Sequence, residues 1–269
     1  MRWLVATGLA LAVGNVLANG LDYRIETRAT PRPLRIHILQ VDLTDKNHEL
    51  AVAVTDDPDG DGPAKARLMD PQTLAAKAHF IAAVNANAFR NLSGTPKDKS
   101  TDSFMAGDVC DVLGWVVADG VLRSLPEQGF WSFWLDTNGQ GHISSVKEAV
   151  PARLAVSGFF GLLRDGKVLP NAGGTLHPRT ALGLDAEGRR LTLVVVDGRR
   201  PGFSEGMSEY ELAGLMDGLG CRDALNLDGG GSSAMLMTDP AGLLQIVNRP
   251  SEKSGPRPVP VIIGVRKSQ

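Results

Sequence analysis

The sequence has no excess of one charge and no basic cluster, since its 269 residues include 28 Lys and Arg and 30 Asp and Glu. The formal charge at pH 7 is −2. This balance argues against a nucleic-acid-binding protein and against a protein that binds membranes electrostatically. Apolar residues make up 43% and charged residues 22% of the chain, which indicates a globular protein rather than a disordered one.

Motifs for two common kinds of site are also absent. No glycine-rich dinucleotide fingerprint leads into a helix, which argues against a dinucleotide cofactor. The only two cysteines, Cys110 and Cys221, form no Cys-x-x-Cys pair and have no zinc-type spacing to histidine, so a thiolate metal site is not expected. The sequence leaves open whether they form a disulfide or remain buried free thiols.

Long apolar runs are confined to the first twenty residues. Arg2 provides a positive start, the stretch 3–17 is apolar apart from two polar residues, and Ala18 lies where secretory cleavage requires a small residue. We therefore predict a signal peptide over 1–18 and a secreted or periplasmic mature chain over 19–269. The alternative is a retained anchoring helix, for which the stretch is short. No later segment is long enough for a membrane span.

The 31 glycines and 16 prolines lie largely in turn-like dipeptides, which favours many short strands over a helical bundle. Asp-Gly at 119–120 and at 165–166 predicts two tight hairpin turns. Apolar runs predict strands at 34–41, 50–54, 80–85, 113–118, 180–184, 191–196, 224–227 and 259–265.

Two helices have recognisable starts. Ser208 and Glu211 form a capping box before an apolar stripe that ends at Gly220. Asp70-Pro71 resembles an N-cap followed by a first-turn proline. No internal repeat or proline-rich linker divides the chain. The expected fold is therefore a single α+β domain, rich in strands, with a mixed β-sheet and a few flanking helices.

The most unusual segment is NLDGGGSS at 226–233. Because strand side chains alternate, Asn226 and Asp228 are expected on one face at the end of a strand. The glycines permit a sharp turn with N–H groups free to face an anion. A carboxylate next to such a cradle suits cleavage of a bond beside a phosphate, and a flexible turn is the alternative. The rest of the cradle comprises Gly229, Gly230, Gly231, Ser232 and Ser233.

The segment belongs to a longer set of stretches, namely HPRTALGLD at 177–185, VVVDGRRPGFSEGMS at 194–208, EYELAGLMDGLGCRDALNLDGGGSSAM at 209–235, VNRPSEKSGPRPVPVIIGV at 247–265 and, more weakly, AAVNANAF at 82–89. Together these stretches resemble the phosphodiester glycosidase family. The resemblance implies hydrolysis of a sugar-1-phosphate diester at the anomeric carbon–oxygen bond, which releases a free sugar and a phosphomonoester. It implies a sugar-phosphate or glycan substrate, such as an exopolysaccharide, and no required cofactor.

Three residues are the candidates for catalysis. Asp228 is the first choice for the nucleophile or general base at the sugar carbon. Arg179 has the guanidinium geometry that binds two phosphate oxygens, with a surface salt bridge as the alternative. Asp197 ends an apolar strand and is the second carboxylate, or only part of an Asp-Gly turn. The resemblance favours Arg199 over Arg200 as a further phosphate ligand.

The other candidates would bind substrate. Asn85 ends a predicted strand and could bond a sugar hydroxyl or hold a loop. His177 could transfer a proton or orient a neighbour. Arg257 could contact phosphate or form a structural ion pair. The predicted binding set is Asn85, His177, Arg199, Ser204, Asn226, Gly229, Gly230, Gly231, Ser232, Ser233 and Arg257.

An acidic loop at 56–63 carries a weak metal signature. Asp57, Asp59 and Asp61 alternate before Gly62, as at the start of a calcium loop. The twelfth position, where such loops have a bidentate Glu, is Leu68. Calcium is therefore the one cofactor candidate, and a solvated acidic turn is the alternative.

Two other functions remain open at this stage. A hydrolase that breaks the phosphorus–oxygen bond would use the same groups and release a sugar phosphate. A non-catalytic protein that binds phosphorylated glycans would need the anion site alone. The presence of two carboxylates beside the predicted phosphate ligands favours a hydrolase.

Overall fold

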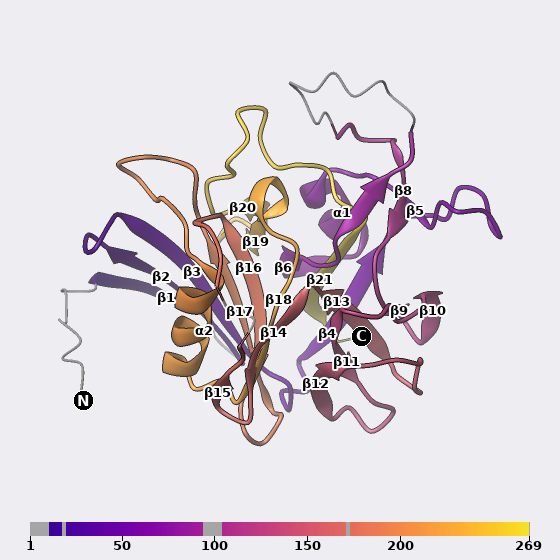
Figure 1. Ribbon diagram of the computed structural model, residues 1–269, viewed down its shortest axis with the longest axis horizontal. Helices are drawn as coiled ribbons and strands as arrows, with labels where there is room; N and C mark the ends of the chain where they lie inside the picture. Colours follow the sequence, from indigo (N-terminus) through magenta and orange to yellow (C-terminus); the bar gives the residue numbers. More distant parts are fainter. Residues whose placement is uncertain (1–10, 18–19, 94–103, 171–172, 269) are drawn as a thin grey trace.

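The computed structural model describes residues 11–17, 20–93, 104–170 and 173–268 (Figure 1). The largest sheet has eight strands in the order β1-β2-β3-β17-β16-β18-β14-β15. These strands are β1 Leu11–Leu17, β2 Leu21–Arg28, β3 Leu34–Asp42, β17 Arg190–Val196, β16 Arg179–Leu184, β18 Asp223–Asn226, β14 Phe160–Arg164 and β15 Lys167–Val168.

Three smaller sheets complete the described fold. One five-stranded sheet consists of β20 Leu244–Ile246, β19 Met235–Thr238, β6 Phe80–Asn85, β21 Val261–Lys267 and β4 His48–Val54. The other consists of β10 Val121–Ser124, β9 Val116–Ala118, β13 Leu154–Gly158, β11 Trp131–Leu135 and β12 Gly141–Ser145. The three-stranded sheet consists of β5 Ala66–Arg67, β8 Val109–Val112 and β7 Phe89–Asn91.

The predicted strand-rich domain is confirmed, but the prediction of a mixed sheet is wrong. Every strand pair in the described chain is antiparallel. Parallel neighbours need long crossover connections, usually helical. The described chain has only two short α-helices, α1 Pro71–Lys77 and α2 Glu209–Gly218, besides the 3₁₀ turn η1 Gly230–Ser232. The α+β description therefore fits only loosely.

The packing of β17 explains why its sequence is almost entirely apolar. Leu193 and Val195 join the main core, whereas Val194 and Val196 join a second cluster with Leu212 of α2. Both faces of the strand are thus covered, and alternation of polar residues is unnecessary. The second cluster packs α2 against one face of the eight-stranded sheet (Figure 1).

The predicted local signals are confirmed in detail. The Ser208 hydroxyl accepts from Glu211 N, and the Glu211 carboxylate accepts from Ser208 N, which completes the capping box of α2. The Asp70 side chain caps α1 by accepting from Thr73 N. Both Asp-Gly turns have two successive positive φ angles, as a tight hairpin turn requires.

The two cysteines are buried free thiols in different clusters, so the disulfide alternative is wrong.

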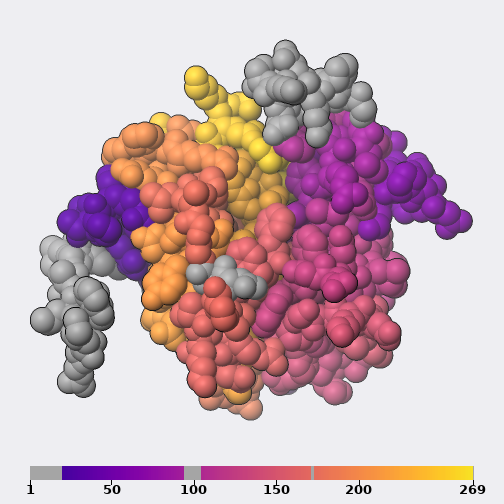
Figure 2. Space-filling view, in the orientation of Figure 1, coloured from indigo at the N-terminus to yellow at the C-terminus, as the bar shows by residue number. Residues whose placement is uncertain are grey.

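The predicted cleavage site at Ala18 lies outside the described residues. Residues Leu11–Leu17, which the prediction assigns to the signal peptide, form β1 and pair with β2 along its length. None of the helices in the described ranges combines the length and apolarity that crossing a membrane requires. In the space-filling view, the indigo N-terminal strands lie on the left of the face beside the orange segment around 200, and the purple to magenta part of the chain lies on the right (Figure 2).

Candidate active site

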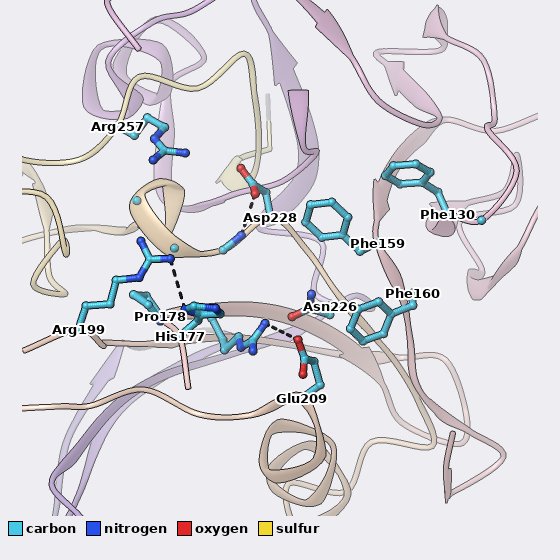
Figure 3. A pocket seen from close by; sticks show the side chains of 15 residues that line it. Phe130, Phe159, Phe160, His177, Pro178, Arg199, Glu209, Asn226, Asp228 and Arg257 are labelled. Atoms are coloured by element: carbon cyan, nitrogen blue, oxygen red, sulfur yellow. Dashed lines mark hydrogen bonds and ion pairs between the residues drawn. The ribbon is translucent and has the colours of Figure 1, made fainter. Parts of the chain in front are cut away.

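A pocket of about 620 Å³ lies at the carboxyl end of β18 (Figure 3). Strand β18, the loop before β16, the turn after β17 and the segment before β21 all contribute to it. The structure brings nine of the predicted site residues to its lining. These are His177, Arg179, Arg199, Asn226, Asp228, Gly229, Gly230, Gly231 and Arg257.

Asp228 follows β18 at the base of the pocket. Its backbone N–H donates to Ala86 O at 3.0 Å, and its backbone carbonyl accepts from Asn85 Nδ2 at 2.7 Å. The carboxylate accepts from Gly229 N at 3.0 Å. Burial raises the pKa of Asp228 to about 6, although the nearby Ser232 hydroxyl and the charge of Arg257 oppose the shift. The group is therefore mostly ionised at pH 7 and still basic enough to accept a proton.

The glycine loop works differently from the predicted anion cradle. Gly229 N donates to the Asp228 carboxylate, and Gly230 N donates to Pro178 O at 2.9 Å. Two of the three glycine N–H groups are thus already used. A Cβ at Gly230 would lie 3.1 Å from Arg199 Nη2, and one at Gly231 would lie 2.7 Å from Arg257 Nη2. The glycines therefore allow two arginines to approach the loop closely.

The three arginines of the pocket differ in their partners. Arg179 is almost fully occupied, because it forms an ion pair with Glu209 at 2.8 Å and donates to Met207 O and Thr175 O. Burial lowers its pKa, and Glu209 opposes that shift. Arg257 pairs with Glu252. Arg199 has no acidic partner within the described ranges.

His177 touches the guanidinium of Arg199. Its Nδ1 lies 3.3 Å from Arg199 Nη2, and its Nε2 lies 2.7 Å from Thr175 Oγ1. A guanidinium only donates, so Nδ1 accepts and the Nε2–H of the neutral ring donates to Thr175. Burial and the charges of Arg199 and Arg179 lower the pKa of His177, which keeps the ring neutral. The geometry thus fits the orienting role and leaves neither nitrogen free for proton transfer.

Two predicted residues lie behind the pocket rather than in its lining. Asp197 is buried, and its Oδ1 accepts from Asn248 Nδ2 at 3.1 Å and from Arg249 N at 2.8 Å. Its Oδ2 lies 3.4 Å from His37 Nε2. The segment 202–206 matches Gly-x-Ser-x-Gly, but the buried Ser204 hydroxyl donates to Asp197 O at 2.6 Å, unlike an exposed nucleophile.

Three predicted substrate ligands are also buried beside the pocket. Asn85 Oδ1 accepts from Thr180 Oγ1 at 2.8 Å and from Ala234 N at 3.1 Å, so both ends of its amide bind protein. Ser233 Oγ lies 3.3 Å from Thr180 Oγ1. Ser232 Oγ is buried and has no hydrogen-bond partner of ordinary geometry in the described chain. The Asn85 and Ser233 side chains thus hold the loop, as the alternative for Asn85 anticipated.

The acidic loop does not assemble a metal site among the described residues. Asp57 Oδ1 accepts from Asp59 N and Gly60 N, and Asp59 Oδ2 accepts from Ala64 N. The carboxylates of Asp57 and Asp59 thereby close local turns.

Six other residues that line the pocket were not in the predicted set, among them Glu209 and three phenylalanines. Glu209 directly follows the N-cap of α2. An acidic residue at this position is typical of a helix start, so the sequence gives no sign that it lines a site. Phe130, Phe159 and Phe160 form the wall away from Arg199 and Arg257. The pair Phe159-Phe160 directly follows Gly158, and a sequence reader could notice two adjacent large apolar residues at a strand end.

Comparisons with known proteins place this geometry in context. The family model for phosphodiester glycosidase matches residues 78–266. No curated protein matches the sequence significantly. The catalytic domain of zebrafish N-acetylglucosamine-1-phosphodiester alpha-N-acetylglucosaminidase, auto-inhibited by its pro-peptide, is 20% identical with a TM-score of 0.69, covering 97% of this chain and 88% of that one.

Two bacterial structures share the fold. A Burkholderia pseudomallei protein described as exported is 17% identical with a TM-score of 0.61, covering 87% of this chain and 74% of that one. A hypothetical protein from Synechocystis is 14% identical with a TM-score of 0.60, covering 91% and 62%. The family match covers more than half of the sequence, and the chain therefore belongs to the phosphodiester glycosidase family.

Proposed function

We propose that the protein hydrolyses the anomeric carbon–oxygen bond of sugar-1-phosphate diesters, of which N-acetylglucosamine-1-phosphodiesters are the model. Water supplies the hydroxyl of the free sugar, and the phosphate leaves as a monoester. The observation that supports this most directly is that Asp228, a carboxylate with a raised pKa, shares one pocket with Arg199 and Arg257.

The chemistry fits the charges of these residues. The Asp228 carboxylate would attack the anomeric carbon or take a proton from the attacking water. Negative charge develops on the departing phosphate, and Arg199, which lacks an acidic partner in the described chain, is placed to bind it. A phosphate is a good leaving group, so the step depends little on a general acid.

The second carboxylate of the pocket is Glu209. Its ion pair with Arg179 fixes both side chains at the start of α2, on the other side of the pocket from Arg257 (Figure 3). We assign this pair to substrate positioning. Asp197 would act indirectly, by positioning Arg199. Its hydrogen bonds to Asn248 and Arg249 fix the chain just after β17, two residues before Arg199.

We also propose that the protein works outside the cytoplasm. The apolar start of the chain followed by Ala18 supports export. The likeness to a Burkholderia protein whose name describes it as exported is consistent with it. Sequencing the N-terminus of protein recovered outside the cytoplasm would test both the export and the cleavage site, since a first residue other than Asn19 contradicts the predicted boundary.

The function is tested by hydrolysis in oxygen-18 water. Purified protein is incubated with sugar-1-phosphate diesters, including UDP-N-acetylglucosamine, and the products are analysed by mass spectrometry. Label in the free sugar supports cleavage at the anomeric carbon. Label in the phosphate would indicate a phosphodiesterase, and saturable binding without product would indicate a glycan-binding protein. Asp228→Asn should abolish turnover, and Asp61→Asn in the exposed acidic loop is the matched control.

A further inference from the structure

One wall of the pocket is aromatic, and it lies across Asp228 from the arginines. In Figure 3, Arg199 and Arg257 are on one side of Asp228, and Phe159 and Phe130 are on the other. The ring centroids of Phe130 and Phe159 are 5.9 Å apart, with 31° between the ring planes. Phe159 is 40% exposed, so much of its ring remains free for a ligand.

This wall is attached to β18, the strand that leads to Asp228. Phe159 N donates to Asn226 O at 2.9 Å, and Phe160 pairs with Asn226 in the ladder between β14 and β18. Gly158 contacts Asn226 O so closely that a Cβ there would clash with it. The backbone at Phe159 is therefore held by a hydrogen bond to β18, two residues before Asp228.

The side chain of Asn226 adds a polar group beside this wall. Asn226 lines the pocket, is only 3% exposed, and its Oδ1 has no hydrogen-bond partner in the described chain. A buried amide oxygen without a partner is unfavourable, and a ligand that donates to it would remove that penalty. An aromatic surface with one unsatisfied acceptor matches a ligand that has an apolar face and hydroxyl groups.

We propose that Phe159, Phe130 and Asn226 form the subsite for the sugar ring of the substrate. This inference rests on the proposed function, because it uses the order of groups around the scissile bond. If Asp228 acts at the anomeric carbon and the arginines hold the phosphate, the ring extends away from the arginines, toward the phenylalanines. The C–H face of the ring packs on Phe159, and a ring substituent donates to Asn226. The group beyond the phosphate then leaves past Arg199 and Arg257.

The test compares two ligands that differ only in the sugar. Binding of UDP-N-acetylglucosamine and of the methyl ester of UDP, in which a methyl group replaces the sugar, is measured by calorimetry with the Asp228→Asn protein. The expected result is tighter binding of the sugar ligand. Adding Phe159→Ala or Asn226→Ala should weaken binding of the sugar ligand about fivefold and leave the methyl ester unchanged. Arg199→Ala should weaken both.

Control variants distinguish the loss of the sugar subsite from a folding defect. Leu243 is a large apolar side chain that is 59% exposed on the turn between β19 and β20, so Leu243→Ala should change neither affinity. Phe159→Tyr, which keeps the ring, should retain sugar binding. Equal affinity for the two ligands, binding of neither, or equal weakening of both by Phe159→Ala would overturn the subsite. Oxygen-18 in the phosphate would overturn the proposed function alone, since the affinity difference does not depend on which bond breaks.

Discussion

The side-chain amide of Asn85 donates a 2.7 Å hydrogen bond to the backbone carbonyl of Asp228. Asn85 ends β6 in a five-stranded sheet, whereas Asp228 follows β18 in the eight-stranded sheet. The same amide accepts from Thr180 of β16 and from Ala234 N. One buried side chain therefore joins the two sheets at the point where the proposed reactive carboxylate leaves its strand.

Replacing Asn85 by Ala should destabilise the fold and misplace Asp228. The change leaves a carbonyl, a hydroxyl and an N–H without their partner, so we expect the free energy of unfolding to fall by about 2–3 kcal/mol. Urea denaturation measures this, and turnover of the folded fraction should fall through kcat. Asn138→Ala, at an exposed turn, is the control and should stay within about 0.5 kcal/mol of wild type. An Asn85→Ala protein as stable as wild type would contradict the joining role.

Activity should depend on the ionisation of Asp228. Its pKa is raised to about 6, and the ionised carboxylate is the reactive form in the proposed mechanism. We expect kcat/KM to fall about tenfold for each pH unit below that pKa. A pH–rate profile measured with a sugar-1-phosphate diester checks this. A profile that stays flat down to pH 4.5 would be incompatible with the assignment.

The same pKa has a consequence for stability, with a defined sign. An unfolded Asp titrates near 3.9, so between about pH 4 and pH 6 the folded protein binds more protons at Asp228 than the unfolded chain does. The contribution of this group to stability is therefore complete below pH 4 and is lost as the pH rises through 6. Asp228→Asn removes this dependence, so the variant should gain stability relative to wild type over that interval.

The sequence was sufficient to predict the strand content, both capping motifs, both hairpin turns and the segment on which the pocket is built. Each of these depends on residues close together in the chain. The bonding partners of the Asp197 carboxylate were not predictable, because Asn248 and His37 approach it only through long-range packing. The aromatic wall was missed because Phe130 meets the adjacent pair Phe159-Phe160 only through the fold.

Arg199 and Arg200 are adjacent in sequence and have opposite expected roles. Arg200 donates through Nε and Nη2 to Pro250 O, at 3.1 and 2.6 Å, and so holds the segment before β21. Arg199 contacts only His177 through its side-chain hydrogen bonds in the described chain. Arg199→Ala should raise KM for the diester about 10-fold or more, since a charge-assisted contact to phosphate is lost. Steady-state kinetics check this against Arg200→Ala, which should lower the melting temperature and leave KM nearly unchanged. The reverse pattern would exchange the two roles.

Two glycines with similar φ angles allow the close approach of Arg199 to the glycine loop to be tested. Gly230 has φ +63° and Gly202 has φ +76°, so alanine strains the backbone at either position. A Cβ at Gly202 meets open space, whereas a Cβ at Gly230 lies 3.1 Å from Arg199 Nη2. Both substitutions should cost about 1 kcal/mol of stability by chemical denaturation. Only Gly230→Ala should also raise KM, because it pushes the guanidinium away from the loop that adjoins Asp228. If the two variants change KM equally, the glycine at position 230 is needed for its backbone conformation and not for the close approach of Arg199.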